Sequence, residues 1–506
     1  MIKKIKNINE LLLITEELQT QGKKIVHCHG VFDLLHIGHI KHFEEAKALG
    51  DVLIVSITPD EFVNKGPGRP AFTTKLRLHA LAALEVVDYV ISNKWPTAIE
   101  IIKELRPNIY CKGPDYKNPS DDITGKISEE EEAITSVGGR IVYTDDVTFS
   151  SSNLLNKFGD LHSNDQETFI KSIVDKYSFE EIKLQVEEFK KLKVLIIGET
   201  IIDQYVFCEA LGKSGKEPVL VLRDLESEEY LGGSIATARH LSEFCESVSV
   251  LSFLGDKDEH RSFIENNIEE NINLNFLIKN NSPTIIKRRF VDNVDRKKIL
   301  GVYSINDDSL SKGEETEFLN SIDKLTKEND LIIISDYGHG IITPVIANHI
   351  SSMDKFVSLN AQVNAANIGT HNIRQYNDID CLIINANELR HEMRQRDGNI
   401  EDLAAKLKDS ISAKYMTVTK GKNGAFLISD KKEATNCPAF ANQVVDKIGS
   451  GDALLSLLSV CLFIGMEEDL ALLIASIAAA QSVESIGNSS PINKVNLLKT
   501  ISHFLK

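Results

Sequence analysis

The sequence predicts an α/β protein built from two doubly wound units, and three observations predict it. Short apolar runs typical of strands alternate with helical segments along most of the chain. Two such runs, at 23–33 and 190–203, each end in a glycine and an acidic residue, as the first strand of a parallel sheet commonly does. The length of 506 residues exceeds one ordinary core and allows two to four domains.

The individual elements follow from this alternation. In the first unit we expect strands at 51–57, 86–92, 108–113 and 140–145 and helices at 73–85 and 98–106. A helix at 179–193 is expected either as the linker between the units or as the start of the second unit. In the second unit we expect strands at 331–337, 381–387 and 415–421 and a helical end rich in small residues at 470–487. A polar stretch at 159–169 marks the boundary. The predicted domains are therefore 1–158 and 191–506, joined by 159–190.

Composition limits the function classes. The formal net charge is −17, and the basic run Lys287-Arg288-Arg289 is short, so a nucleic-acid partner is not expected. No apolar stretch reaches the roughly 18 residues of a membrane span, and the N-terminus resembles an amphipathic helix. Seven cysteines without a CxxC pair indicate neither a zinc site nor a disulfide framework. A cytoplasmic protein acting on small molecules is expected.

The segment GVFDLLHIGHIKHF at 30–43 is the first candidate site. His36 and His39 flank Gly38 in the turn that follows the first strand and opens a helix. A helix N-terminus attracts phosphate through its N–H groups, and imidazoles can donate hydrogen bonds to a phosphate whose charge grows in a transition state. A chance helix start with two incidental histidines is the alternative. The pattern favours a site for the α-phosphate of a nucleotide.

This segment resembles the HxGH signature of the cytidylyltransferase-like nucleotidyltransferases, whose fold is Rossmann-like. KGPGRP at 65–70, KGPDYK at 112–117 and FSSSNLL at 149–155 are most similar to the heptose 1-phosphate adenylyltransferase subgroup. Members join a sugar 1-phosphate to a nucleoside triphosphate and release pyrophosphate. A class I aminoacyl-tRNA synthetase shares the histidine motif, but this sequence has neither its lysine loop nor a basic surface.

The resemblance implies roles for particular residues. His36 and His39 would stabilise the pentavalent phosphorus, and Lys65 would meet the phosphates of the nucleotide. Mg²⁺ would bridge the phosphates of ATP, with CTP as the alternative nucleotide. The other implied positions are, for the nucleotide, Gly30, Phe32, Asp33, Gly38, Arg77, Ser150, Ser151 and Ser152, and, for the substrate, Lys112 and Asp115.

A second candidate site lies at 449–452, where the sequence is GSGD before an apolar helix. Two glycines at a helix N-terminus expose backbone N–H groups that can form an anion hole. Asp452 could accept a proton from an alcohol that attacks a γ-phosphate. An ordinary glycine turn with Asp452 as helix cap is the alternative.

The region from about 190 to the end resembles the ribokinase-like (PfkB) sugar kinases, through LGGSIATAR at 231–239, NANE at 385–388, VTKGKNGA at 418–425 and GSGD. SDYGHG at 335–340 and PTIIKRRFV at 283–291 are most similar to the heptose 7-phosphate kinase subgroup. The resemblance makes Asp452 the base and puts Gly449 and Gly451 in the anion hole. It further implies the sugar pocket (Asp203, Gly232, Gly233), a phosphate site (Lys287, Arg289), Mg²⁺ held through water (Asn385, Glu388) and the nucleotide region (Thr419, Gly421).

Some positions depart from that subgroup. Ala236 replaces an asparagine, Asn360 stands where an aspartate is expected, and the first strand ends in GETIID. The combination of domains resembles the bifunctional enzymes of ADP-heptose synthesis in lipopolysaccharide assembly, with the domain order reversed. A CTP-dependent glycerol- or polyol-phosphate cytidylyltransferase is one alternative, and a non-catalytic pseudokinase domain is another. The resemblance also implies a homodimer.

Overall fold

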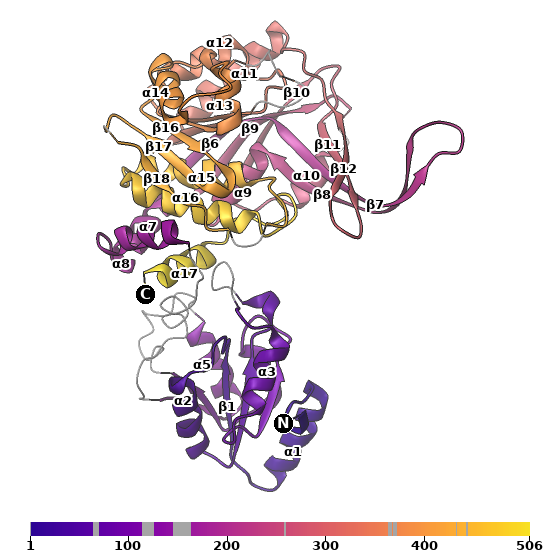
Figure 1. The fold of residues 1–506 in the computed structure, drawn as a ribbon, viewed down its shortest axis with the longest axis vertical. Helices are drawn as coiled ribbons and strands as arrows, with labels where there is room; N and C mark the ends of the chain where they lie inside the picture. Colours follow the sequence, from indigo (N-terminus) through magenta and orange to yellow (C-terminus); the bar gives the residue numbers. More distant parts are fainter. Residues whose placement is uncertain are drawn as a thin grey trace. The chain divides into compact units, whose positions relative to one another are not determined.

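The structure is a computed structural model that describes residues 2–63, 70–113, 126–144, 163–257, 260–362, 367, 372–431, 433–441 and 444–505 (Figure 1). The chain forms two compact units, Met1–Glu167 with Leu498–Lys506, and Thr168–Leu497. The first unit thus includes C-terminal residues that the predicted domain 191–506 assigned to the second. Within the described ranges no helix is long and apolar enough to cross a membrane.

The first unit is a doubly wound α/β fold, as predicted. Its five parallel strands have the order β3-β2-β1-β4-β5. The strands are β1 (Ile25–Gly30), β2 (Val52–Ile57), β3 (Tyr89–Ser92), β4 (Ile109–Lys112) and β5 (Arg140–Tyr143). The helices are α1 (Ile8–Thr20), α2 (Ile37–Ala48), α3 (Thr74–Ala82), α4 (Ile99–Leu105) and α5 (Ile127–Ser136).

Apolar side chains cover both faces of this sheet. On one face, Val26 and Leu53 pack with Phe43 of α2 and Leu81 of α3. On the other face, residues of α1, α4 and α5 pack against alternate residues of the same strands. Strands buried on both faces are nearly continuous apolar runs, which is why β2 has the sequence VLIVSI. This packing fixes α2 against the strand that precedes it.

The second unit contains a nine-stranded sheet and a four-stranded sheet. The larger has the order β10-β9-β6-β13-β14-β15-β16-β17-β18, with parallel pairing as far as β16. The smaller has the order β12-β11-β7-β8. The strands are β6 (Lys193–Gly198), β7 (Thr200–Lys213), β8 (Leu220–Gly233), β9 (Ser247–Gly255), β10 (Ile272–Lys279), β11 (Ile285–Asp292), β12 (Lys298–Ser304), β13 (Leu331–Asp336), β14 (Phe356–Ala361), β15 (Cys381–Asn385), β16 (Tyr415–Thr419), β17 (Ala425–Ile428) and β18 (Thr435–Cys437).

Helices cover both faces of the larger sheet. Helices α11 to α14 contribute Phe318, Ile346, Leu389 and Leu403 to the apolar cluster on one face. Helix α15 is buried along most of its length and contacts α9, α16, β13 and β14. The helices are α7 (Asn164–Val174), α8 (Phe179–Glu188), α9 (Ser234–Ser242), α10 (Arg261–Asn266), α11 (Lys312–Thr326), α12 (Pro344–Ser351), α13 (Ala386–Glu392), α14 (Ile400–Ser410), α15 (Ser450–Phe463), α16 (Glu468–Ser482) and α17 (Lys494–Phe504).

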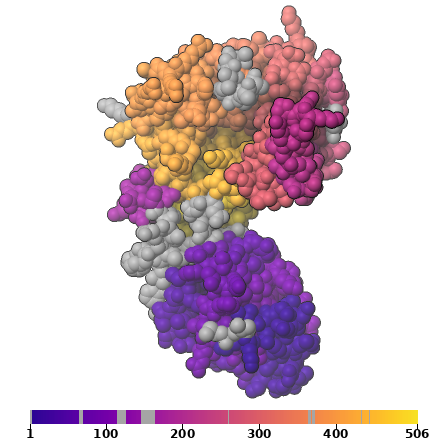
Figure 2. Space-filling model, turned by 45° about the vertical axis from the view of Figure 1, so that its right-hand side comes forward, coloured from indigo at the N-terminus to yellow at the C-terminus, as the bar shows by residue number. Residues whose placement is uncertain are grey.

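The hairpin of β7 and β8 extends away from the rest of the second unit (Figure 1) and lies at its surface in the space-filling view (Figure 2). Its base is buried, and its outer part is exposed. The sequence analysis did not predict this hairpin. The outer half of β8 is exposed on both faces, Leu220, Val221 and Leu225 included, and its sequence LVLRDLE lacks the alternation of apolar and polar residues that marks a half-buried strand.

Candidate functional sites

The histidine pair opens helix α2 at the end of β1, as the sequence predicts. His36 is the N-cap residue of α2, and Gly38 and His39 lie in its first turn. The imidazole rings of His36 and His39 are stacked with their centroids 3.9 Å apart. A helix N-terminus has backbone N–H groups without partners in the helix. Two imidazoles beside such groups form an arrangement suited to an anionic phosphate.

The loop before α2 is held in place by Phe32. Its backbone is in the left-handed region, with φ of 48°, and its ring meets the edges of the His39 and Phe43 rings, with centroids 5.3 and 5.0 Å away. A Cβ at Gly30 would lie 2.9 Å from the Phe32 ring. Gly30 therefore allows the ring to fold back, and Phe32 in turn supports the imidazole of His39.

Arg77 and Asp33 connect this loop to its neighbours. Arg77 is buried; its guanidinium donates to the carbonyl oxygens of Val31 and Phe72 at 2.6 and 2.9 Å and to Asp60 at 2.6 Å. The Asp33 carboxylate accepts from the N–H of Phe72 at 3.2 Å. The guanidinium already donates to groups of the protein. The geometry therefore favours a role for Arg77 in positioning the loop over the direct contact with the nucleotide that the resemblance implies.

Lys112 ends β4, next to the end of β1. Its ammonium lies 2.7 Å from the Glu130 carboxylate, and both side chains are largely buried. Its charge, together with burial, lowers the pKa of His27 to about 3, with burial the larger cause. The predicted site residues Lys65, Asp115, Ser150, Ser151 and Ser152 lie outside the described residues.

In the second unit Asp452 lies in the first turn of α15. The N-cap residue Gly449 has φ of 92°, and a Cβ there would lie 1.9 Å from the Asn488 side chain. Only glycine fits this position, for both reasons. A Cβ at Gly451 would meet no atom within 4 Å, so the backbone on that side is open. Open backbone at a helix N-terminus is what an anion hole requires.

Asp452 receives a hydrogen bond from Tyr337. The Tyr337 hydroxyl donates to the Asp452 carboxylate at 2.7 Å, and both side chains are buried. Burial raises the pKa of Asp452 to about 6, while the Tyr337 hydrogen bond acts in the opposite direction. A carboxylate with a pKa near the working pH can take a proton and release it again, as a general base must.

Strand β11 brings two cations to the same place. Lys287 is buried, and its ammonium lies 4.8 Å from the centre of the Tyr337 ring. Burial lowers the pKa of Lys287. Arg289 forms an ion pair with Asp203 of β7. A Cβ at Gly232 would lie 2.5 Å from the Asp203 carboxylate, and one at Gly233 would lie 2.2 Å from a backbone oxygen of Glu199. Asp203 therefore lies beside Gly232 and Arg289, and its charge acts on the ammonium of Lys287.

Asn385 and Glu388 form the capping box of α13. The Asn385 side chain accepts from the N–H of Glu388 at 2.9 Å, and the Glu388 carboxylate accepts from the N–H of Asn385 at 3.0 Å. Asn385 pairs in register with Thr419, which ends β16, and Gly421 follows with φ of 58°. The carboxyl ends of these parallel strands meet at one sheet edge, where ligands bind in such folds. Carboxylate and amide oxygens are ligands that suit Mg²⁺.

The sequence analysis gave no role to Tyr337 or Glu199, although both lie in quoted segments. The Glu199 carboxylate accepts from the N–H groups of Tyr337 and His339, each at 2.9 Å, and so holds the loop after β13. Burial raises the pKa of Glu199 to about 7, helped by the nearby Asp336. Their position directly after buried parallel strands was the available signal.

The departures from the family pattern have local structural partners. The Asn360 amide donates to the carbonyl oxygen of Ile383 at 2.9 Å and accepts from the side chain of Gln362 at 3.3 Å. An amide can do both, whereas an ionised aspartate can only accept. Ala236 is buried in α9. Among the described residues, no hydrogen bond joins Asn360 or Ala236 to Asp452.

Comparison with known proteins agrees with this division. Residues 191–495, more than half of the chain, match the pfkB family of carbohydrate kinases. The chain belongs to the pfkB carbohydrate kinase family. Residues 27–157 match the cytidylyltransferase-like family. The nucleotidyltransferase-like domain therefore precedes the kinase domain, as predicted. Both the fold class and the family resemblances are confirmed.

Among the curated relatives, the bifunctional protein HldE of Nitratiruptor is 42% identical over 138 residues, which cover 27% of this pfkB-family chain and 30% of that protein. The bifunctional protein HldE of Geobacter metallireducens is 39% identical over 160 residues, 30% of this chain and 31% of that protein. The chain therefore matches less than a third of the length of these relatives. Phosphofructokinase-2 from Escherichia coli covers 62% of the chain at 14% identity with a TM-score of 0.50, a likeness of fold.

Proposed function

We propose that this protein is a bifunctional enzyme of nucleotide-activated sugar synthesis. The first unit transfers a nucleotidyl group from ATP to a heptose-like sugar 1-phosphate and releases pyrophosphate. The second unit transfers the γ-phosphate of ATP to a sugar or sugar phosphate. One observation carries the proposal: in each unit the candidate catalytic side chain stands in the first turn of a helix that can bind phosphate, His39 in α2 and Asp452 in α15.

In the nucleotidyl transfer, the sugar phosphate oxygen attacks the α-phosphorus and pyrophosphate leaves. His36 and His39 stabilise the charge that grows on the non-bridging oxygens. The Phe32 ring keeps the His39 imidazole in place, and Arg77 holds the loop through the carbonyl oxygens of Val31 and Phe72. Mg²⁺, where bound, would offset part of the negative charge of the triphosphate.

In the phosphoryl transfer, Asp452 accepts the proton of the attacking sugar hydroxyl. The backbone at Gly449 and Gly451 binds the transferred phosphoryl group. Lys287 and the Arg289–Asp203 pair lie on the sugar side, and a buried cation there suits a phosphorylated sugar. Asn385 and Glu388 would orient Mg²⁺ through water.

Sequence similarity to the HldE relatives and the intact Asp452, Asn385 and Glu388 support this reading. Exposed apolar residues on the β7–β8 hairpin, among them Leu211, Leu220 and Leu225, support a homodimer that buries them.

Nucleotides and sugar phosphates are metabolites of the cytoplasm, where we place the reaction.

The test offers the full chain each pairing of ATP or CTP with heptose 1-phosphate or glycerol 3-phosphate and measures pyrophosphate. We expect pyrophosphate release with ATP and heptose 1-phosphate. Release only with CTP and glycerol 3-phosphate would establish the cytidylyltransferase alternative. ADP release is measured in parallel with a panel of sugars and sugar phosphates. If none of them accelerates ADP release, the second unit is a pseudokinase.

A further inference from the structure

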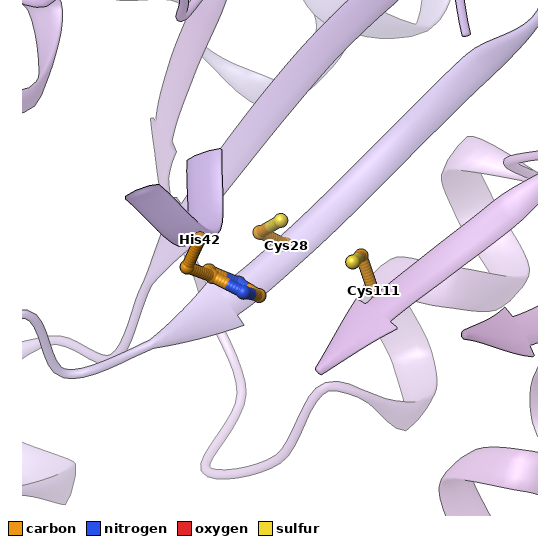
Figure 3. Close-up of side chains that lie close together, drawn as sticks. All are labelled: Cys28, His42 and Cys111. Carbon is orange, nitrogen blue, oxygen red and sulfur yellow. The ribbon is translucent and has the colours of Figure 1, made fainter. Parts of the chain in front are cut away.

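Three side chains with ligand atoms that suit zinc lie together in the first unit. Cys28 of β1, Cys111 of β4 and His42 of α2 each offer an atom within 4.8 Å of the other two (Figure 3). Cys28 and Cys111 are register partners on adjacent parallel strands, so their side chains leave the sheet on the same face. Helix α2 covers that face and places His42 over the pair.

The surroundings prepare His42 as a ligand. Its Nδ1 lies 3.0 Å from the Thr144 hydroxyl, which donates its one proton to the carbonyl oxygen of Lys112 at 3.3 Å. The hydroxyl oxygen then accepts from Nδ1–H, and this tautomer leaves the lone pair on Nε2. A histidine that binds a metal usually donates its other ring N–H to such a partner.

We propose that Cys28, Cys111 and His42 bind one zinc ion. Two sulfurs and one imidazole nitrogen form a donor set that zinc accepts and that Mg²⁺ and Ca²⁺ disfavour. In a tetrahedral zinc site the ligand atoms lie about 3.5–3.8 Å apart, so closure requires side-chain shifts of about 1 Å. Binding releases the thiol protons to solvent and leaves a fourth position for water.

The site links two strands to the helix that carries the histidine pair. His42 lies three residues after His39, on the next turn of α2. Zinc would join α2 to β1 and β4 and so hold the first turn of α2 against the strand ends. The ion would therefore stabilise the nucleotidyltransferase-like unit without entering the reaction. Sequence spacing gives no sign of this site, because its ligands come from three separate elements.

The test uses the full-length reduced protein, purified without a metal-affinity tag and incubated with zinc chloride. After gel filtration in a weak chelator, elemental mass spectrometry should find one zinc per chain. The double variant Cys28→Ser/Cys111→Ser and the variant His42→Gln should each lose at least tenfold of the bound zinc. The matched controls are Cys461→Ala, which removes another buried thiol, and His39→Ala, which removes a nearby imidazole. Both should retain the ion.

A second measurement needs no variant. Cobalt added to the metal-free wild type should give a thiolate-to-cobalt charge-transfer band, and zinc should raise the melting temperature of the first unit. A wild type without stoichiometric zinc, or a double variant that retains it, would overturn the site. Isolation of the chain with Cys28 and Cys111 joined as a disulfide would overturn it as well. These readouts are independent of pyrophosphate release, so failure here leaves the proposed function standing.

Discussion

The hydroxyl of Tyr337 donates a hydrogen bond to the carboxylate of Asp452 across 2.7 Å, joining the end of strand β13 to the first turn of helix α15. The two residues are 115 positions apart in the sequence. Lys287 approaches the same tyrosine ring from strand β11. This relationship brings the candidate base and the candidate substrate cation around one aromatic side chain.

The first prediction concerns pH. Asp452 must be ionised to accept a proton, so kinase kcat/KM falls as the pH decreases through its pKa of about 6. The Tyr337 hydrogen bond stabilises the ionised form, and Tyr337→Phe removes it. The acidic limb of the profile should therefore move upward by about one pH unit.

The matched control is Tyr376→Phe, which removes a buried hydroxyl that donates at 2.7 Å to Asp336 instead. Its profile should keep the wild-type limb. An unchanged limb in Tyr337→Phe would show that the Tyr337 hydrogen bond does not tune the base.

The second prediction concerns the phosphate of the sugar substrate. Lys287→Met removes the buried ammonium beside Tyr337. A charged hydrogen bond to phosphate contributes about 1.5–3 kcal/mol, so the KM for a phosphorylated sugar should rise roughly 10- to 100-fold. Arg288→Met is the control, because Arg288 hydrogen-bonds Gln204 and, as the next residue of the strand, points to the opposite face. Equal effects of both variants in steady-state kinetics would count against a phosphate site at Lys287.

The third prediction concerns Arg77. Arg77→Met leaves the carbonyl oxygens of Val31 and Phe72 without their donor and Asp60 without its cation. The cost to the first unit should be about 3 kcal/mol, measured as its free energy of unfolding in urea. The kinase rate should not change. If instead the variant unfolds like the wild type and only its KM for ATP in pyrophosphate release rises, Arg77 binds the nucleotide directly.

The fourth prediction separates two roles of Asn385. Asn385→Ala removes the cap of α13 and should destabilise the second unit by about 1 kcal/mol. Asn385→Ser keeps an N-cap hydroxyl and should recover most of that stability. If Asn385 also orients Mg²⁺, both variants should need more Mg²⁺ for half-maximal kinase rate. A serine variant with wild-type Mg²⁺ dependence would leave the residue a cap alone.

The local elements were predictable because strong local patterns determine them. The apolar run of β1 and the histidine pair predicted where α2 begins, and the glycines at 449 and 451 predicted where α15 begins. The predicted strands at 331–337 and 381–387 contain β13 and β15. Each depends on hydrophobic periodicity and on turn residues, which neighbours in the sequence carry.

Contacts between distant segments were not predictable. The partner of Asp452, the burial of Arg77 and the meeting of Cys28 with His42 and Cys111 depend on which strands are adjacent in the sheet. One sequence contains no direct signal of strand order. The exposed β7–β8 hairpin was also missed, because a strand with both faces in solvent needs no apolar period.

The most direct test of the central claim measures both activities on the same preparations. Pyrophosphate release with ATP and heptose 1-phosphate, and ADP release with the best sugar acceptor, are compared for wild type, His39→Ala and Asp452→Asn. We predict that His39→Ala lowers the rate of pyrophosphate release about 10²- to 10³-fold and leaves the rate of ADP release unchanged. Asp452→Asn should lower the rate of ADP release about 10²- to 10⁴-fold and leave the rate of pyrophosphate release unchanged. Loss of both activities in either folded variant, or of neither, would contradict two independent phosphate-handling sites on this chain.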